Sequence, residues 1–276
     1  LHRLIRRQRQ MCIRDSYLTV EDIQKWVIKN DGDIHGAPTF IISLEQTLHG
    51  MVTPFDELIR IKKFCIENNL KLHCDGARIW NACVKQNIDP KKYGTIFDSI
   101  SVCLSKSMGA PIGSVLLGSA NFIKKANHFK KQVGGGIRQS GIISSMALVA
   151  IQPGWENKLQ YSHDLAAEMN DYLVNELHVP LESPTETSFV FIDLEAAKIN
   201  PDVLVKKALK YGCRVMGGRI AFHYQIDKSL LKNLKLALKE TVEYSKKYPF
   251  DHAGPTQIYR SESTDIINGD IQTFKY

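Results

Sequence analysis

The residues best suited to chemistry are charged side chains that stand where predicted strands end. Lys106 follows the largely apolar segment 97–104 and lies between two serines, ahead of the turn formers Gly109, Pro111 and Gly113. A lysine is rarely found in such apolar company unless a partner group neutralises its cost. Two interpretations fit this segment: a turn lysine that extends its amine to water, or a desolvated lysine whose amine forms a Schiff base with a carbonyl compound.

A second charged turn lies upstream, at the end of the predicted strand 70–74. It contains Asp75 and, three residues later, Arg78. Pyridoxal phosphate enzymes use such a pair: a lysine holds the cofactor aldehyde, and a carboxylate keeps the pyridine nitrogen protonated so that the ring can accept electrons. The alternatives are an Asp75 that caps the next helix and an Arg78 that forms a surface salt bridge.

Three motifs in this order carry a closer resemblance. They are the decapeptide 73–82, the segment 101–114 that contains Ser-Lys-Ser-Met-Gly-Ala-Pro, and the glycine-rich segment 134–141. Together they resemble the low-specificity L-threonine aldolases, which are fold-type I pyridoxal phosphate enzymes, from about residue 18 to about residue 236. The resemblance implies pyridoxal 5'-phosphate as cofactor and retro-aldol cleavage of L-threonine or L-allo-threonine to glycine and acetaldehyde.

The resemblance also implies roles for individual residues. Lys106 would be the Schiff-base lysine, Asp75 the partner of the pyridinium nitrogen, and Arg78 a contact of the ring oxygen and of the substrate carboxylate. Lys131 and Arg138 match positions that contact the cofactor phosphate, in part across a subunit interface. A glycine-rich loop can present N–H groups to phosphate, but it can also serve only as a connection, and Lys131 can belong to a solvated helix face.

Two further residues match positions that contact the substrate. His35 corresponds to a histidine that handles the proton of the substrate hydroxyl, and a neutral imidazole suits a general base near pH 7. Arg219 corresponds to an arginine that binds the substrate carboxylate. Each can also be an ordinary loop or strand-end residue. The sequence departs from the family at Gln46, where an asparagine is usual, and at His49, which is displaced by one position and receives no role.

Strands and helices alternate along the chain, which predicts an α/β fold with a mostly parallel sheet and ligands at the carboxyl ends of its strands. Asp75 and Lys106 would then share one edge. The resemblance implies the fold of the pyridoxal-phosphate-dependent transferases, with a large domain and a small α+β C-terminal domain. The expected strands are 39–44, 70–74, 97–104, 113–117, 188–193, 214–216 and 219–223, and the expected helices are 54–69, 121–132, 142–151, 156–177, 201–211 and 229–244.

Four regions are expected from pattern and resemblance. Residues 1–16 are basic, show no periodicity and do not resemble the family; residues 17–155 are a partial large domain that lacks its N-terminal segment; residues 156–248 are the small domain; and residues 249–276 are a loose tail. Because the family carries a further segment before residue 17, an inactive fragment of the aldolase is one of the alternatives.

The composition limits the other functions. The net charge is +7, but the basic residues are spread along the chain and are not interleaved with aromatic residues, which argues against a nucleic-acid partner. No apolar run reaches the roughly 18 residues of a membrane span. The six cysteines show no paired spacing, as expected for reduced thiols in a cytoplasmic protein. We therefore expect a small amino acid as substrate and, from the resemblance, a homo-oligomer that is typically a tetramer.

A different fold-type I enzyme is the main alternative function, either an aminotransferase or a β-eliminating lyase. The motif 134–139 and His35 favour the aldolase, and the reaction products would separate the two.

Overall fold

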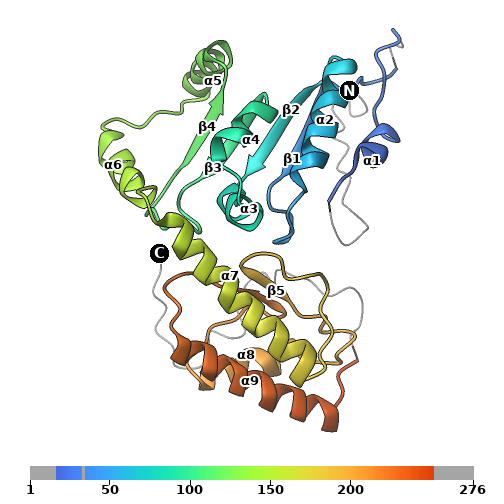
Figure 1. The fold of residues 1–276 in the computed structure, drawn as a ribbon, viewed down its shortest axis with the longest axis vertical. Coiled ribbons are helices and arrows are strands. Elements are labelled where there is room, and N and C mark those ends of the chain that lie inside the picture. Colours follow the sequence, from blue (N-terminus) through green and yellow to red (C-terminus); the bar gives the residue numbers. More distant parts are fainter. Residues whose placement is uncertain (1–16, 33–34, 252–276) are drawn as a thin grey trace. The chain divides into compact units, whose positions relative to one another are not determined.

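The computed structural model describes residues 17–32 and 35–251 (Figure 1). The expectations for residues 1–16 and for the tail beyond residue 251 therefore lie outside the described residues. The chain divides into two compact units. The first holds residues 17–168 together with Ser183–Phe189 and Phe222–Gln225, and the second holds Met169–Glu182, Val190–Ala221 and residues 226–251. The domain boundaries expected from the sequence stay a prediction.

The first unit is built on a four-stranded sheet in the order β1-β2-β3-β4 (Figure 1). The first three strands are parallel, with Glu45 opposite Asp75 and Asp75 opposite Ser101, and β4 runs antiparallel to β3. The mostly parallel sheet predicted from the sequence is confirmed. The carboxyl ends of three strands consequently meet at one edge. The bounds are β1 (Ile41–Glu45), β2 (Lys71–Gly76), β3 (Ser99–Cys103) and β4 (Ser114–Gly118).

The helices of the first unit largely follow the predicted pattern. The short α1 begins with a capping box, in which Thr19 accepts a bond from the Asp22 backbone and Asp22 accepts one in return. The helices are α1 (Val20–Gln24), α2 (Phe55–Glu67), α3 (Ile79–Gln86), α4 (Pro90–Ile96), α5 (Ala120–Gln132), α6 (Gly141–Ala150) and the start of α7 (Trp155–Asp171). None of the described helices is long and apolar enough to cross a membrane.

Two of these helices were not predicted. The sequence predicted no helix between the strands 70–74 and 97–104, but the chain between β2 and β3 folds into α3 and α4. Asn87 ends α3 in the left-handed conformation with φ of 52°, and Asp89 then caps α4 by accepting a 2.8 Å bond from the Lys91 N–H. Both helices are short, so their periodicity is weak, and Tyr93 is fully buried in α4.

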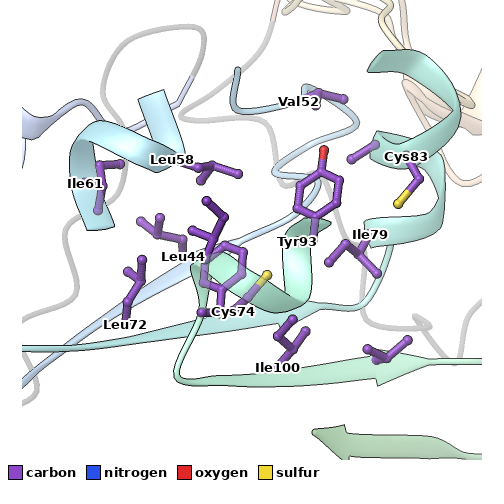
Figure 2. Close-up of a cluster of buried hydrophobic side chains, with 14 of the residues drawn as sticks. Leu44, Val52, Leu58, Ile61, Leu72, Cys74, Ile79, Cys83, Tyr93 and Ile100 are labelled. Atoms are coloured by element: carbon purple, nitrogen blue, oxygen red, sulfur yellow. The ribbon is translucent and has the colours of Figure 1, made fainter. Parts of the chain in front are cut away.

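The core of the first unit lies between the sheet and its helices (Figure 2). Burial alternates along β2, where Leu72 and Cys74 are fully buried while Lys71 and Asp75 are exposed. Tyr93 donates a 2.8 Å hydrogen bond to Gln86 Oε1, so its hydroxyl is paired inside this core. Burial raises the pKa of the Cys65 thiol to about 11 and of the Cys83 thiol to about 12. These cysteines are therefore inert packing groups.

The second unit combines a two-stranded sheet with two long helices. Its elements are the end of α7, the π-helix η1 (Tyr172–Glu176), β5 (Phe189–Phe191) from its second residue on, α8 (Pro201–Lys210), β6 (Arg219–Ala221) and α9 (Lys228–Lys247). Asn200 and Asp227 cap α8 and α9 through their side chains. The predicted strand 214–216 is wrong: Gly217, with φ of 63°, turns the chain, and only an isolated bridge joins Met216 to Arg219.

Candidate active site

The carboxyl edge of the parallel strands carries the first two candidate residues. Asp75 is the penultimate residue of β2, and Lys106 lies in the loop that follows β3. That loop is closed by backbone hydrogen bonds, from Leu104 N to Gly113 O at 3.1 Å and from Gly109 N to Lys106 O at 3.1 Å. Both side chains are exposed at this edge. The predicted proximity of the two strand ends is therefore present in the fold.

Asp75 is fixed by its neighbours in the chain. Its Oδ1 atom accepts a 3.0 Å hydrogen bond from the Ala77 N–H, and its carbonyl accepts a 2.9 Å bond from the Gln46 N–H. The alternative of a helix cap is not what the structure contains, because Arg78 occupies the N-cap position of α3 and no side chain caps that position. The carboxylate of Asp75 is thus held at the strand end and remains open for a ligand.

Gln46 has a clear structural task. It is 1% exposed, its Oε1 atom accepts a 3.1 Å bond from the Thr53 N–H, and its Nε2 atom donates a 3.2 Å bond to the Thr53 carbonyl. Its own carbonyl accepts a 3.1 Å bond from the Arg78 N–H. The side chain that departs from the family pattern therefore closes the loop 46–53 and ties that loop to the start of α3.

Arg78 is held beside the lysine loop by two contacts. Its Nη1 atom donates a 3.1 Å hydrogen bond to Ser107 Oγ, one residue after Lys106, and its Cζ atom lies 4.2 Å from the centre of the Phe189 ring. A guanidinium stacked on an aromatic ring keeps its planar fork in one orientation. A fixed guanidinium at the edge that also carries an amine and a carboxylate gives this edge the donors that bind an anion.

Ser107 is the end of a buried hydrogen-bond network that sequence reasoning missed. Asn81 Nδ2 donates a 3.0 Å bond to Ser107 Oγ, and Asn81 Oδ1 is 3.0 Å from His163 Nε2. Burial, reinforced by the charge of Lys85 and opposed by that of Asp164, lowers the pKa of His163 to about 4. A signal existed in the sequence, because Leu159, His163 and Ala166 follow helical spacing and place the histidine on the buried face of α7.

The remaining candidates lie in other segments. Lys131 is exposed in the last turn of α5, and Arg138 is exposed in the turn that precedes α6. His35 is exposed in a turn that borders residues outside the described range. Arg219 begins β6 in the second unit and is half-buried there. Asp75, Arg78 and the loop of Lys106 thus lie at one edge of the sheet in the first unit, and the roles of all seven candidate residues remain predictions.

The donor set at this edge fits pyridoxal phosphate. A carboxylate can pair with the protonated ring nitrogen of the cofactor, an amine can react with its aldehyde, and a guanidinium can bind an anionic substituent. Among the described residues, no group of three or more metal-ligating side chains was found. The carboxylate lies on β2 and the amine on the loop that follows the adjacent parallel strand β3, so the pairing of the two strands brings both segments to the same edge.

Comparison with known proteins agrees with this chemistry. The profile of the family described as beta-eliminating lyase matches residues 5–197. The low-specificity L-threonine aldolase of Eremothecium gossypii is 60% identical over 261 residues, which are 95% of this chain and 68% of the relative. That of Saccharomyces cerevisiae is 59% identical over 265 residues, covering 94% of this chain and 68% of the relative.

A solved structure supports the fold. The threonine aldolase of Leishmania major matches with a TM-score of 0.67 at 18% identity, over 82% of this chain and 68% of that chain. At this identity the likeness concerns the fold alone. It confirms the fold class predicted from the sequence.

Proposed function

We propose that this protein cleaves L-threonine and L-allo-threonine to glycine and acetaldehyde. The chain belongs to the low-specificity L-threonine aldolases and is therefore a carbon–carbon lyase. One observation carries the proposal: Asp75 and the loop of Lys106 share the carboxyl edge of adjacent parallel strands, with Arg78 bonded to Ser107 beside them. Ligands of open α/β sheets bind outside this edge.

Pyridoxal 5'-phosphate is the proposed cofactor. When bound, it supplies an electron sink for the charge that is left on Cα when the Cα–Cβ bond breaks. Lys106 would hold its aldehyde, Asp75 would hold a proton on its ring nitrogen, and Lys131 and Arg138 would hold its phosphate.

The chain's own residues then divide the work of binding and proton transfer. Arg78 binds the substrate carboxylate through its planar fork. The β-hydroxyl proton of threonine must leave as the Cα–Cβ bond breaks, and we assign it to the imidazole of His35, because histidine is the side chain most often used as a general base. Acetaldehyde leaves, and a proton returned to Cα completes glycine.

We also propose a cytoplasmic homo-oligomer, most simply a tetramer. Support for a reducing compartment comes from the cysteines of the described chain, which are free and buried. Support for an assembly comes from large apolar side chains that lie exposed on β4 and α6 of the first unit, namely Val115, Leu116, Leu117, Ile142, Met146, Leu148 and Val149. Light scattering coupled to size-exclusion chromatography measures the mass, and a monomer at micromolar concentration would overturn the assembly.

Product analysis tests the activity. Purified protein with added pyridoxal phosphate is incubated with L-threonine, and acetaldehyde and glycine are measured separately. Equal amounts of the two products, absent with Lys106→Ala, are expected. The alternative function is β-elimination, which the matching family favours; it predicts a 2-oxo acid and ammonia from threonine, and no glycine.

A further inference from the structure

A buried hydrogen-bond network connects helix α7 to the residue that follows Lys106. Asn81 Oδ1 lies 3.0 Å from His163 Nε2, Asn81 Nδ2 lies 3.0 Å from Ser107 Oγ, and Arg78 Nη1 lies 3.1 Å from the same oxygen. All four residues belong to the first unit. The network therefore ends on one residue already assigned to anion binding and on the sequence neighbour of the proposed Schiff-base lysine.

The interior of this network is costly to bury. Asn81 is 0% exposed and His163 is 6% exposed. Buried amide and imidazole groups lower stability unless they are hydrogen-bonded, and apolar side chains of similar size would fill the same space without that cost. The presence of the polar pair Asn81 and His163 at a buried position therefore indicates a role other than packing.

The donors and acceptors of the network can be assigned in one direction. If His163 carries its proton on Nε2, it donates to Asn81 Oδ1, which leaves the Asn81 amide NH₂ to donate to Ser107. Arg78 also donates to Ser107, so the serine oxygen accepts two bonds. The Ser107 hydroxyl proton is then left to point toward an acceptor elsewhere. If His163 carries its proton on Nδ1 instead, the Asn81 amide must flip so that its NH₂ group donates to His163 Nε2. The Ser107 hydroxyl would then donate its proton to Asn81 Oδ1.

We propose that His163 and Asn81 are positioning residues that act through Ser107. They fix Ser107 as an acceptor that holds the Arg78 fork beside Lys106, and they leave the Ser107 hydroxyl proton as a further donor to an anionic ligand of that site. The ligand class is a carboxylate, as in an α-amino acid. The proposal rests on the proposed function for the identity of that ligand, but its geometry is a property of the protein alone.

The state of His163 agrees with this assignment. Lys85 and Asp164 are the charged groups that bear on it, and the burial of the ring lowers its pKa to about 4. The imidazole is thus neutral near pH 7 and has one N–H, as a fixed tautomer requires.

The first test reads the tautomer directly in the protein without substrate. Long-range proton–nitrogen NMR of protein labelled at histidine distinguishes the two ring nitrogens, and His163→Gln identifies the His163 signals by their loss. A neutral ring with its proton on Nε2 at pH 7 is expected. A proton on Nδ1, or a charged ring, would overturn the assignment, whatever reaction the enzyme catalyses.

The second test separates positioning from packing. In His163→Gln the amide NH₂ can replace the Nε2–H donor, whereas His163→Leu keeps the volume and removes the donor. We expect His163→Leu to raise the KM for L-threonine by about tenfold, as one lost hydrogen bond to a charged group allows, while kcat changes by less than about threefold. His163→Gln should stay within about threefold of the unaltered enzyme in both constants.

Two further variants control for effects of packing and of misfolding. Ser162→Ala is the packing control, because Ser162 is buried on the same helix and bonds only the Lys158 carbonyl within its own turn. Ser107→Ala removes the proposed donor without touching α7 and should reproduce the rise in KM if His163→Leu fails to fold. An unchanged KM in Ser107→Ala, or equal losses in His163→Gln and His163→Leu, would overturn the proposal.

Failure of the proposed function remains distinguishable. If the unaltered holoenzyme does not cleave threonine, glycine serves as the carboxylate probe, and its dissociation constant is measured by calorimetry. Weaker glycine binding in Ser107→Ala, with Ser162→Ala unchanged, supports the positioning network without any turnover. Equal glycine binding in all variants counts against it.

Discussion

Asn81 and His163 are separated by 82 positions in the sequence, yet their side chains meet at 3.0 Å inside the first unit. Asn81 lies one helical turn after Arg78, so the first turn of α3 carries the buried amide and follows directly on the half-buried Arg78. A short path of hydrogen-bonded side chains therefore joins His163 on α7, through Asn81, to Ser107 in the loop that follows β3.

The first prediction concerns stability at acid pH. The pKa of His163 is lowered from 6.5 to about 4 in the folded protein. Between these values the unfolded chain binds the proton and the folded chain does not, so stability falls as the pH falls through this window and is fully present above pH 6.5. At pH 4.5 the loss from this residue should be about 2–3 kcal/mol.

Urea unfolding at pH 7 and pH 4.5 checks this value against His163→Gln, which cannot titrate. The unaltered protein should lose more stability between the two pH values than the variant does. A loss of the same size in both proteins would show that His163 is not the group responsible.

Replacing Lys106 by alanine should abolish the covalent attachment of pyridoxal phosphate. The variant should show no visible absorbance band from lysine-bound cofactor, and threonine cleavage should fall by more than about 1,000-fold, because a covalent nucleophile is lost. Borohydride reduction followed by peptide mass spectrometry locates the modified lysine. Lys63→Ala, at an exposed position of α2, is the control, and a label that persists in Lys106→Ala would assign the attachment to another residue.

Asp75→Asn preserves shape and removes the negative charge that the ring nitrogen needs. We expect the rate of cleavage to fall by about 10²–10³-fold, the usual cost of removing one electrostatic contact that acts on developing charge. Glu45→Gln is a matched control, because Glu45 lies opposite Asp75 in the sheet register and makes the same change of charge at the same edge. Similar losses in both variants would mean that the general field of the edge, and no specific contact, is being measured.

The core under the site should be sensitive to truncation. Leu72 is 0% exposed and belongs to the cluster drawn in Figure 2, so Leu72→Ala should lower the free energy of unfolding by about 2–5 kcal/mol. Ile66→Ala, on the outer face of α2 where the side chain is 68% exposed, should cost less than about 1 kcal/mol. Chemical denaturation of the two variants measures the free energy of unfolding. Comparable losses of that free energy in both variants would contradict the description of this core.

The sheet and its edge could be predicted from the sequence because their signals are local. Alternating or continuous apolar runs ended by glycine and proline marked the four strands, and the placement of Asp75 and Lys106 followed from parallel strand order alone. The resemblance supplied the roles. The short helices were not predicted from the sequence. The helix α4, for example, has seven residues, which are too few for a periodic pattern to rise above chance.

The network behind Arg78 could not be predicted for a different reason. Its bonds join α3, the lysine loop and α7, and only the folded chain brings these segments together. The segment 214–216 was misread as a strand because its Val and Met suit a strand locally, whereas the positive φ of Gly217 decides the path of the chain.

The antiparallel strand β4 has a practical consequence for handling this protein. All five of its residues are exposed, and within the described residues β4 pairs with β3 alone, so its other side presents a row of backbone donors and acceptors flanked by Val115, Leu116 and Leu117. Such an edge is a template for adding further strands from any chain in solution. Concentrated samples should consequently aggregate through intermolecular β-pairing unless that edge is covered, and a single lysine in place of Leu116 should raise the solubility limit more than the same change on a helix surface.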